Sequence, residues 1–510
     1  MFIRDVTADS KDGYNNATDT FNETLVFLGA FSDVCYSHVT GLLRDTRVHH
    51  ALARDVESSL YLFNKTLAAH REAWRYVSLA SKTDGGQRDP NELHMPSNAS
   101  LEVKYERKRW RDEMKERSQL WRERARPGLY GTLFGREEMD ILIASCENWM
   151  HRLRQTLEII FLTIGPPSPE YRRSRQAATL AVDDILGRQH RASATPSGDY
   201  NALQGRLREG SSTLPSSSGL IKTIYIDGGE EIDVLVEPRS DNETPTEFMC
   251  HLTWLLQAPI RPDPLISRCR YRLHTLSCLG FIDDPFNTRS LILYRAPQSH
   301  PFASSPPSLH DLISKGPAAK MSLGARYNAA RDLAATLLET HASGWVHGNI
   351  QSRSITMLPR ELNDLEPGPY FVGWGVLQPL EASSFLLEPN LYRHHDRFGR
   401  PSVEYANEHD IYSLGIVLLE LGLWQTMANI FARRLEKSPR FDIVQQGELF
   451  LKIHNQTLDW ANSIEIEREM GKKYAQIVLK CLAWHQMDPV GGMLDFRKQV
   501  VDSLADGCIL

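Results

Sequence analysis

The sequence lacks the features that mark secreted and membrane-spanning chains. Its seven cysteines are scattered and form no CxxC pair, which favours reduced thiols in the cytosol. The N-terminal segment has no apolar core, so no signal peptide is expected. The longest strongly apolar stretch, Leu157 to Ile164, is far shorter than the ~20 residues that a membrane helix needs. A cytoplasmic protein is therefore predicted.

An excess of charge of either sign is also missing. The net charge is -6, and 41% hydrophobic with 24% charged residues is the composition of a soluble globular protein. Nothing in this balance favours a nucleic acid or an acidic membrane as a partner. The 510 residues exceed one ordinary hydrophobic core, so at least two domains are expected.

The first part of the chain carries the pattern of helices. Apolar residues recur at three- and four-residue steps over 20–82 and again over Arg136–Ile164. The pair Pro166–Pro167 ends this pattern, and Ser, Pro and Gly dominate 192–219. The predicted organisation is a flexible N-terminus (1–19), a helical domain (20–165), a helix plus a Ser/Pro-rich linker (166–218) and a second domain (219–505).

The second domain begins with strands and continues with helices. Thr223–Asp227 and Ile232–Val236 are β-branched runs on either side of Gly228–Gly229, which indicates a hairpin. A second strand pair is expected over Leu273–Ile282 and Ser290–Tyr294. Helical patterns dominate afterwards, apart from two short strands near Ser354–Leu358 and Tyr370–Gly373. The fold class predicted is α+β, with a small β-rich lobe and a larger helical lobe.

Three segments in this domain resemble protein-kinase motifs in the order that kinases have them. DIYSLGIVLLEL, which starts at Asp410, resembles the helix that begins D-x-x-S-x-G, where Asp410 can accept backbone N–H groups and Gly415 permits close packing. GWVHGNIQSRSITML follows a helix expected over Leu323–His341 and resembles the catalytic loop H-R-D-L-x-x-x-N. YFVGWG ends where D-F-G would stand. The resemblance implies a bilobal kinase-like fold over 219–505.

The residues that catalyse phosphoryl transfer in kinases are replaced in the catalytic-loop segment. His347 is kept, but Gly348 stands for the arginine and Asn349 for the catalytic aspartate. Ser354 replaces the asparagine that binds metal. Asn349 has neither the charge nor the pKa of a general base, so this loop is not expected to deprotonate a substrate.

The remaining positions are replaced as well. At the D-F-G position Gly373 and Trp374 stand for the first two residues, and Gly375 matches the third. Glu237 falls where the strand lysine should be, and its charge would repel phosphates. Because Gly373 offers no ligand to Mg²⁺, no metal and no cofactor are expected. The sequence thus predicts a pseudokinase, with nucleotide binding doubtful.

The neighbouring residues His394, His395 and Asp396 could suggest a metal site. Adjacent histidines in a loop are more often solvated, and this is the interpretation that the sequence favours.

Longer segments resemble a narrower group, the kinase-like C-terminal domains of fungal proteins. In those proteins a GW[VL]H loop, an LYRHPDR-like segment and an HDIYSLGIVLLE-like helix recur together. Here they read GWVHGNI, LYRHHDRFGRP and HDIYSLGIVLLELGLW, and the similarity runs on through GKKYAQIVLKCL. Many such proteins carry a helical N-terminal domain, some of it related to the HeLo domains of fungal prion-inhibition and heterokaryon-incompatibility systems. Residues 20–165 are compatible with that relationship but carry no specific motif of it.

Three functions follow from these resemblances. The leading hypothesis is a non-catalytic signalling or scaffold module that binds a protein partner or regulates the helical domain. The first alternative is a membrane-active cell-death effector, in which any membrane association would come through the helical domain. The second is an atypical active kinase that uses a relocated carboxylate such as Asp364 or Glu366.

Overall fold

The chain divides into two compact units, which are described separately. Unit 1 comprises Met1–Leu186 with Arg261–Tyr271, and unit 2 comprises Gly187–Ile260 with Arg272–Leu510. The predicted flexible segment 1–19 and the candidate bases Asp364 and Glu366 lie outside the residues that the structure describes. The computed structural model describes residues 23–24, 26–36, 42–44, 50–79, 136–164, 177, 179–180, 182, 186–187, 189–191, 203–208, 219–240, 246–257, 274–284, 289–295, 305–358, 367–375, 386–398, 403–437, 440, 446–484 and 489–507.

Unit 1 is helical over its described residues, as the spacing of apolar residues predicts. Helix α2 (His50–Leu79) packs against α4 (Arg136–Ile164), and a short turn, η1 (Leu42–Arg44), precedes α2. Buried apolar side chains supply most of the contact, and the hydroxyl of Thr156 donates to the buried carboxylate of Asp55 at 2.9 Å. A buried polar pair of this kind costs little only because both partners are present.

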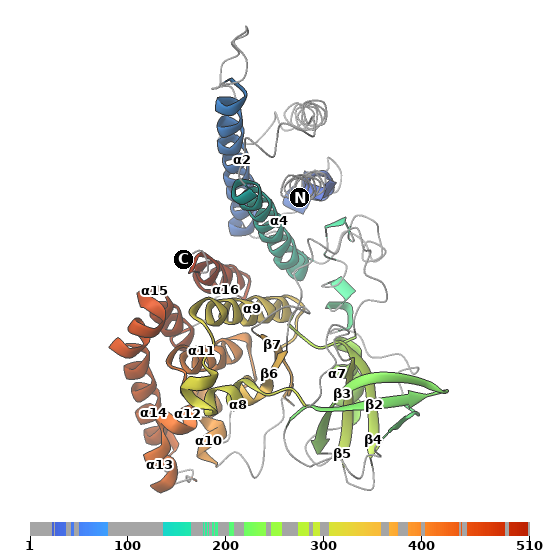
Figure 1. Cartoon of the computed structure of the whole chain (residues 1–510), viewed down its shortest axis with the longest axis vertical. Helices are drawn as coiled ribbons and strands as arrows, with labels where there is room; N and C mark the ends of the chain where they lie inside the picture. The colour runs from blue at the N-terminus through green and yellow to red at the C-terminus, as the bar shows by residue number, and fades with distance from the viewer. Residues whose placement is uncertain are drawn as a thin grey trace, which may run out of the picture. The chain divides into compact units, whose positions relative to one another are not determined.

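Unit 2 begins with a curled antiparallel sheet of five strands in the order β1-β2-β3-β5-β4 (Figure 1). Gly228 and Gly229 form the turn of the predicted hairpin, with φ angles of +55° and +93° that side chains rarely adopt. Helix α7 (Thr246–Leu255) follows β3 and packs on β4. The strands are β1 (Arg206–Leu207), β2 (Ile221–Asp227), β3 (Glu230–Ser240), β4 (Cys278–Asp284) and β5 (Arg289–Arg295).

The sequence places residues 203–208 in the linker, and this is wrong, because they lie in the sheet. Arg206 pairs with Ile226 and Leu207 with Tyr225 on one edge of the sheet. On the other edge the amide of Leu203 donates to the Phe281 carbonyl at 2.7 Å. Because this segment pairs with β2 and also bonds to the opposite edge strand β4, it closes the curled sheet. The sequence does not reveal this strand, because two residues are too few for a strand pattern and the surrounding residues are rich in Ser and Pro.

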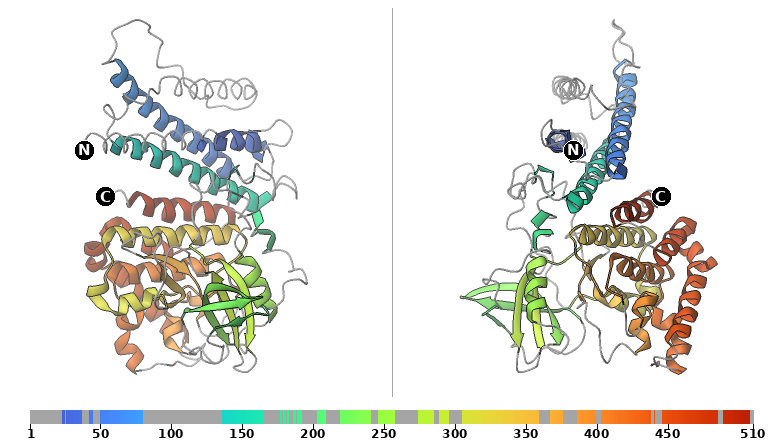
Figure 2. Two further views of the ribbon diagram at one scale, coloured as in Figure 1. Left: turned by 45° about the vertical axis from the view of Figure 1, so that its right-hand side comes forward. Right: turned by 180° about the vertical axis from the view of Figure 1, so that it is seen from behind.

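Helices dominate the rest of unit 2 (Figure 2), and a two-stranded ribbon of β6 (Ile355–Leu358) and β7 (Gly368–Phe371) lies among them (Figure 1). The strand expected over Leu273–Ile282 begins only at Cys278. Residues 274–277 precede it, and the His274 carbonyl accepts from the Phe371 amide in β7. The main helices are α8 (Leu309–Ser314), α9 (Leu323–Ala342), α11 (Asn407–Leu423), α14 (Gln446–Ala461), α15 (Ile464–Leu482), α16 (Pro489–Phe496) and α17 (Asp502–Gly507), with short turns α10 (Leu387–Asn390), α12 (Met427–Ile430) and α13 (Ala432–Lys437) between them.

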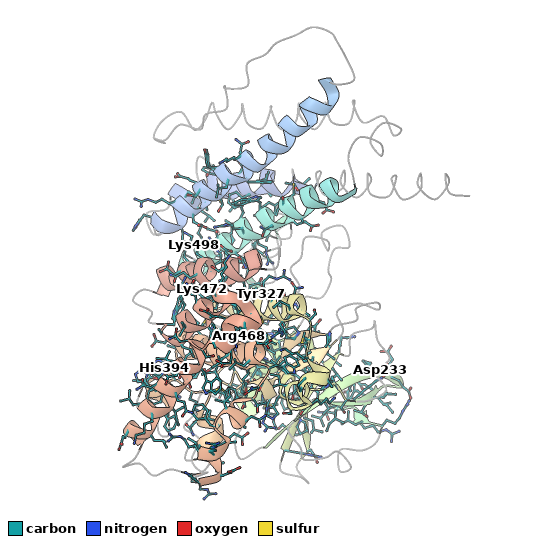
Figure 3. All side chains as sticks on the ribbon, turned by 60° about the vertical axis from the view of Figure 1, so that its left-hand side comes forward. Asp233, Tyr327, His394, Arg468, Lys472 and Lys498 are labelled. Atoms are coloured by element: carbon teal, nitrogen blue, oxygen red, sulfur yellow. The ribbon has the colours of Figure 1, made fainter. Side chains whose placement is uncertain are left out.

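Helix α11 is the centre of the helical part, and it is buried on all sides from His409 to Leu423. Its partner α15 breaks at Gly471, whose φ of +81° interrupts the helical backbone. The break leaves carbonyl groups that helix α9 satisfies: Tyr327 donates to the Met470 carbonyl at 2.6 Å. Figure 3 shows Tyr327 within this helical part, well away from Asp233 in the sheet. A mixed α+β fold, with the sheet first and the helices after it, agrees with the predicted class.

A glycine sets the distance between α11 and α15. A Cβ atom at Gly415 would lie 2.9 Å from the Cβ of Cys481 and 3.2 Å from the side chain of Leu482. Real Cβ atoms do not approach this closely, so a larger residue must push the helices apart. The close packing that the sequence assigns to Gly415 is therefore found.

We expect Gly415→Leu to destabilise unit 2 by about 1–3 kcal/mol or more through overpacking. Denaturant unfolding of the full chain, followed by tryptophan fluorescence, measures this change. Gly447→Leu is the matched control, because a Cβ at Gly447 meets no atom within 4 Å. Equal midpoints for the two variants would contradict the packing described here.

Candidate functional site

The carboxylate of Asp410 anchors the loop that starts at His347. Asp410 is fully buried, and it accepts hydrogen bonds from the backbone N–H of His347 at 2.7 Å and of Gly348 at 3.0 Å. Tyr405 donates its hydroxyl to the same carboxylate at 2.7 Å, and the ring of His341 lies 3.2 Å away. The sequence expects Asp410 to bind backbone N–H groups, and it does so across the fold, to a loop 62 and 63 residues away.

The charge of Asp410 is maintained despite its burial. Burial alone would raise the pKa of this carboxyl, but the hydrogen bond from His341 and the nearby His347 and Tyr405 outweigh it, so the pKa lies below its ordinary value. An ionised carboxylate that is buried must be compensated in this way, since an unpaired buried charge is very costly. The anchor therefore depends on all of its donors together.

His347 is packed among aromatic rings and is neutral. Its ring lies 4.6 Å from the ring of Trp374 and 5.0 Å from that of Phe371, measured between centroids. Burial lowers the pKa of His347 to about 4. The backbone N–H of Asn349 donates to its Nδ1 at 3.3 Å. At neutral pH this ring therefore carries no charge.

Two glycines let the 347–354 loop approach the 372–375 loop closely. The amide of Gly375 donates to the His347 carbonyl at 2.9 Å. A Cβ at Gly375 would lie 2.6 Å from the carbonyl oxygen of Gly348, so no larger residue fits without a shift of the backbone. We refer to these two loops, together with Glu237 and Arg239 of β3, as the loop site.

The side chains of Asn349 and Ser354 are used for contacts within the loop site. Asn349 donates its amide to the Gly373 carbonyl at 2.8 Å and accepts a bond from Gln351 at 3.0 Å. The hydroxyl of Ser354 donates to the Asn349 carbonyl at 2.7 Å and accepts from the amide of Gln351. The residues that stand at the base and metal positions of the resemblance thus hold backbone groups in place.

Glu237 ties the sheet to the loop that contains Gly373. One carboxylate oxygen accepts a bond from the Tyr294 hydroxyl at 2.9 Å and from the Gly373 amide at 3.2 Å. The other oxygen pairs with Arg239 at 2.5 Å. Residues two apart on a strand point to the same face, which explains why Arg239 reaches Glu237 although Pro238 lies between them. These contacts of Glu237 could not be predicted from the sequence.

The carboxylates in and beside the loop site are held by bonds within the protein. Glu237, the carboxylate of the loop site, is bound by Arg239, Tyr294 and Gly373, and the neighbouring carboxylate of Asp410 on α11 is bound by backbone N–H groups. The guanidinium of Arg239 forms an ion pair with Glu237 through its Nε. The geometry favours a site that is closed by its own side chains.

A second cluster joins the segment around His394 to the start of α11. His394 is only 7% exposed, so the expectation of a solvated residue is wrong for it. Asp396 accepts from the His394 ring at 2.7 Å and lies 3.1 Å from the Nε2 of His409, and ligand atoms of the three residues lie within 4.8 Å of one another. Figure 3 labels His394 in the helical part of unit 2. His409, which the sequence did not single out, completes the group.

The hydrogen bonds argue against a metal ion in this cluster. The backbone amide of Ala406 donates to Nδ1 of His409 at 2.7 Å, so Nδ1 carries the lone pair and Nε2 carries the proton. A protonated nitrogen cannot bind a metal, and it donates to Asp396 instead. The cluster is a His–Asp–His bridge. It joins the LYRHHDR segment to the start of the HDIYSLG helix.

The chain matches no protein-family model, and no curated protein matches it either. Within the described part of the chain, no helix combines the length and the apolar character that a membrane span requires.

Lowering the pH should reduce the stability of the folded protein, because His347 is neutral in the folded state. Because its folded pKa is about 4 and its ordinary value is 6.5, the unfolded chain takes up a proton between these pH values while the folded chain does not. Stability is therefore lost as the pH falls from 6.5 towards 4, by up to roughly 3 kcal/mol from this one group. The slope of unfolding free energy against pH should be smaller in His347→Gln.

Denaturant unfolding at several pH values between 4 and 7 measures the slope of unfolding free energy against pH. This range includes the ordinary histidine pKa of about 6.5. His50→Gln is the control, because His50 is an exposed histidine on α2. If His347→Gln keeps the slope of the unsubstituted protein, His347 is not held neutral in the folded state.

Proposed function

We propose that residues 219–505 form a bilobal kinase-like domain that does not catalyse phosphoryl transfer and acts as a signalling or scaffold module. The order of elements supports the fold: an antiparallel sheet with helix α7, then the 347–354 loop, the 372–375 loop and the central helix α11. The bond between Asp410 and the loop at His347 supports it as well, since it joins two of the motifs that carry the resemblance.

The observation that carries the non-catalytic part is the set of contacts around Gly373. Its amide binds the carboxylate of Glu237, and its carbonyl accepts from the side chain of Asn349. In an active kinase the three corresponding positions would bring a metal-binding carboxylate, a phosphate-binding lysine and a base to one place. Here Glu237 and Asn349 both bind the backbone of Gly373, so the charges that would stabilise a phosphoryl-transfer transition state are missing.

Restoring one residue should not restore activity. Asn349→Asp supplies a carboxylate but leaves position 373 without a metal ligand and position 237 with a negative charge. Gly373→Asp meets a steric barrier, because Gly373 has a φ of +71° and a Cβ there would lie 3.0 Å from the Cβ of Ser354. The lost groups act as a unit, which makes single restorations ineffective.

We therefore expect no magnesium-dependent transfer or hydrolysis of labelled phosphate above background in the unsubstituted protein, in Asn349→Asp or in Gly373→Asp. The assay uses the full chain with Mg²⁺ and with Mn²⁺, and thermal melting checks that each variant is folded. Turnover by the unsubstituted protein that Glu237→Ala or Asn349→Ala abolishes would overturn the non-catalytic interpretation, and would favour the atypical active kinase.

The same proposal assigns the partner to a protein and not to a nucleic acid. Within the described residues, much of the polar chemistry of the loop site is satisfied internally, so recognition falls to the outer surface of unit 2. The relationship to fungal incompatibility systems is part of this proposal, and it rests on the GWVHGNI, LYRHHDRFGRP and HDIYSLGIVLLELGLW segments.

A further inference from the structure

Helix α14 meets the turn η9 (His395–Arg397) and helix α11 through a group of rings. The His395 ring lies 5.1 Å from the Phe450 ring on α14, and Phe450 stacks on His454 of the same helix at 5.5 Å, both measured between centroids. The ring of Tyr412 on α11 stacks on His454 at 5.9 Å, and its hydroxyl lies 3.3 Å from Nδ1 of His454. Histidine and aromatic rings thus join α14 to η9 and α11.

Four histidines gather at this contact around one carboxylate. His394 and His409 both donate to Asp396, at 2.7 and 3.1 Å. The His394 ring also lies 4.1 Å from the ring of His395. Within the described residues, neither His395 nor His454 has a carboxylate partner, and Asp396 is already shared by two rings. A positive charge on His395 or His454 would therefore lack a counter-charge at the contact.

The other charged side chains of η9 and α14 do not supply that counter-charge. Arg393 and Arg397 flank the two adjacent histidines in the sequence and are themselves positive. On α14, Glu448 forms an exposed ion pair with Lys452. Asp459 is exposed on a later turn of the helix. These groups leave the balance at the rings on the positive side once a histidine is protonated.

The two helices that pack on α14 add no charge to the balance either. Helix α11 turns His409 and Tyr412 towards the contact, and its carboxylate Asp410 is bound by the loop at His347. The residues that α15 buries carry no charge at neutral pH, and the one among them with a hydroxyl, Tyr474, donates to the Leu418 carbonyl at 2.8 Å. The contact is therefore built for neutral rings.

Proton uptake works against this contact. Burial, followed by the nearby His395 and His394, lowers the pKa of His454 below its ordinary value. Burial also lowers the pKa of His394, although Asp396 acts in the opposite direction. A released α14 would bind protons more readily than the docked one, so the stability of docking is complete above the ordinary histidine pKa of about 6.5 and is lost as the pH falls below it.

We propose that the contact of α14 with η9 and α11 is a pH-sensitive latch, which holds α14 near neutral pH and releases it when His395 and His454 are protonated. The two positive rings would then repel each other across Phe450. Release would uncover an apolar surface, since Phe450 packs on the buried Phe398 at 5.8 Å. The proposal does not depend on the kinase-like interpretation.

Hydrogen–deuterium exchange of the full chain tests the latch at about pH 7.5 and about pH 5.5, which bracket the ordinary histidine pKa. Exchange is expressed as protection factors, which removes the effect of pH on the intrinsic exchange rate. In the unsubstituted protein, the protection of α14 should fall roughly threefold or more relative to that of α11 between the two pH values. In His395→Gln/His454→Gln this relative fall should disappear.

The single variant His454→Gln keeps a polar group opposite the Tyr412 hydroxyl, and it decides the question if the double variant already releases α14 at the higher pH. His50→Gln is the control, because it removes an exposed histidine of α2 and should leave the relative fall unchanged. Equal protection of α14 at both pH values in the unsubstituted protein would overturn the latch. So would a fall that α11 shares equally, or one that His454→Gln leaves at full size.

Discussion

The buried carboxylate of Asp410 is the interaction on which unit 2 depends. It stands on the central helix α11 and binds the backbone of the loop at His347, so the position of that loop follows from the position of the helix. The helix is fixed in turn by its close packing on α15 at Gly415. A buried ionised group is tolerated only when its donors are in place. Removal of any one donor would therefore disturb both the loop and the helix start.

The loop site is a second consequence of this anchoring. Once the 347–354 loop is fixed, Asn349 can reach the Gly373 carbonyl, and Glu237 can reach the amide of the same residue. The loop at Gly373 is thus bound from the helical side and from the sheet. A residue that binds through its backbone needs no side chain, and φ of +71° at Gly373 favours glycine there. The side chains of Asn349 and Glu237 supply these internal bonds.

The sequence was sufficient for the class of fold and for the local elements, because periodicity and glycine turns are local properties. The hairpin at Gly228–Gly229 and the buried helix with Asp410 could be read from a few consecutive residues. The closure of the sheet by 203–208 could not, since two paired residues give no periodic signal. The bond between His409 and Asp396 also could not be predicted from the sequence. It depends on which ring nitrogen of His409 accepts from the Ala406 amide.

The central claim is that Glu237 and Asn349 bind the backbone of Gly373 in place of a magnesium–nucleotide complex. A thermal-shift titration of the full chain with ATP, with and without Mg²⁺, tests it most directly, because a ligand that binds only the folded state must raise the melting temperature. The account predicts that Mg²⁺ adds nothing to the effect of ATP. A melting temperature that rises with ATP only when Mg²⁺ is present, and that no longer rises in Asn349→Ala, would contradict it.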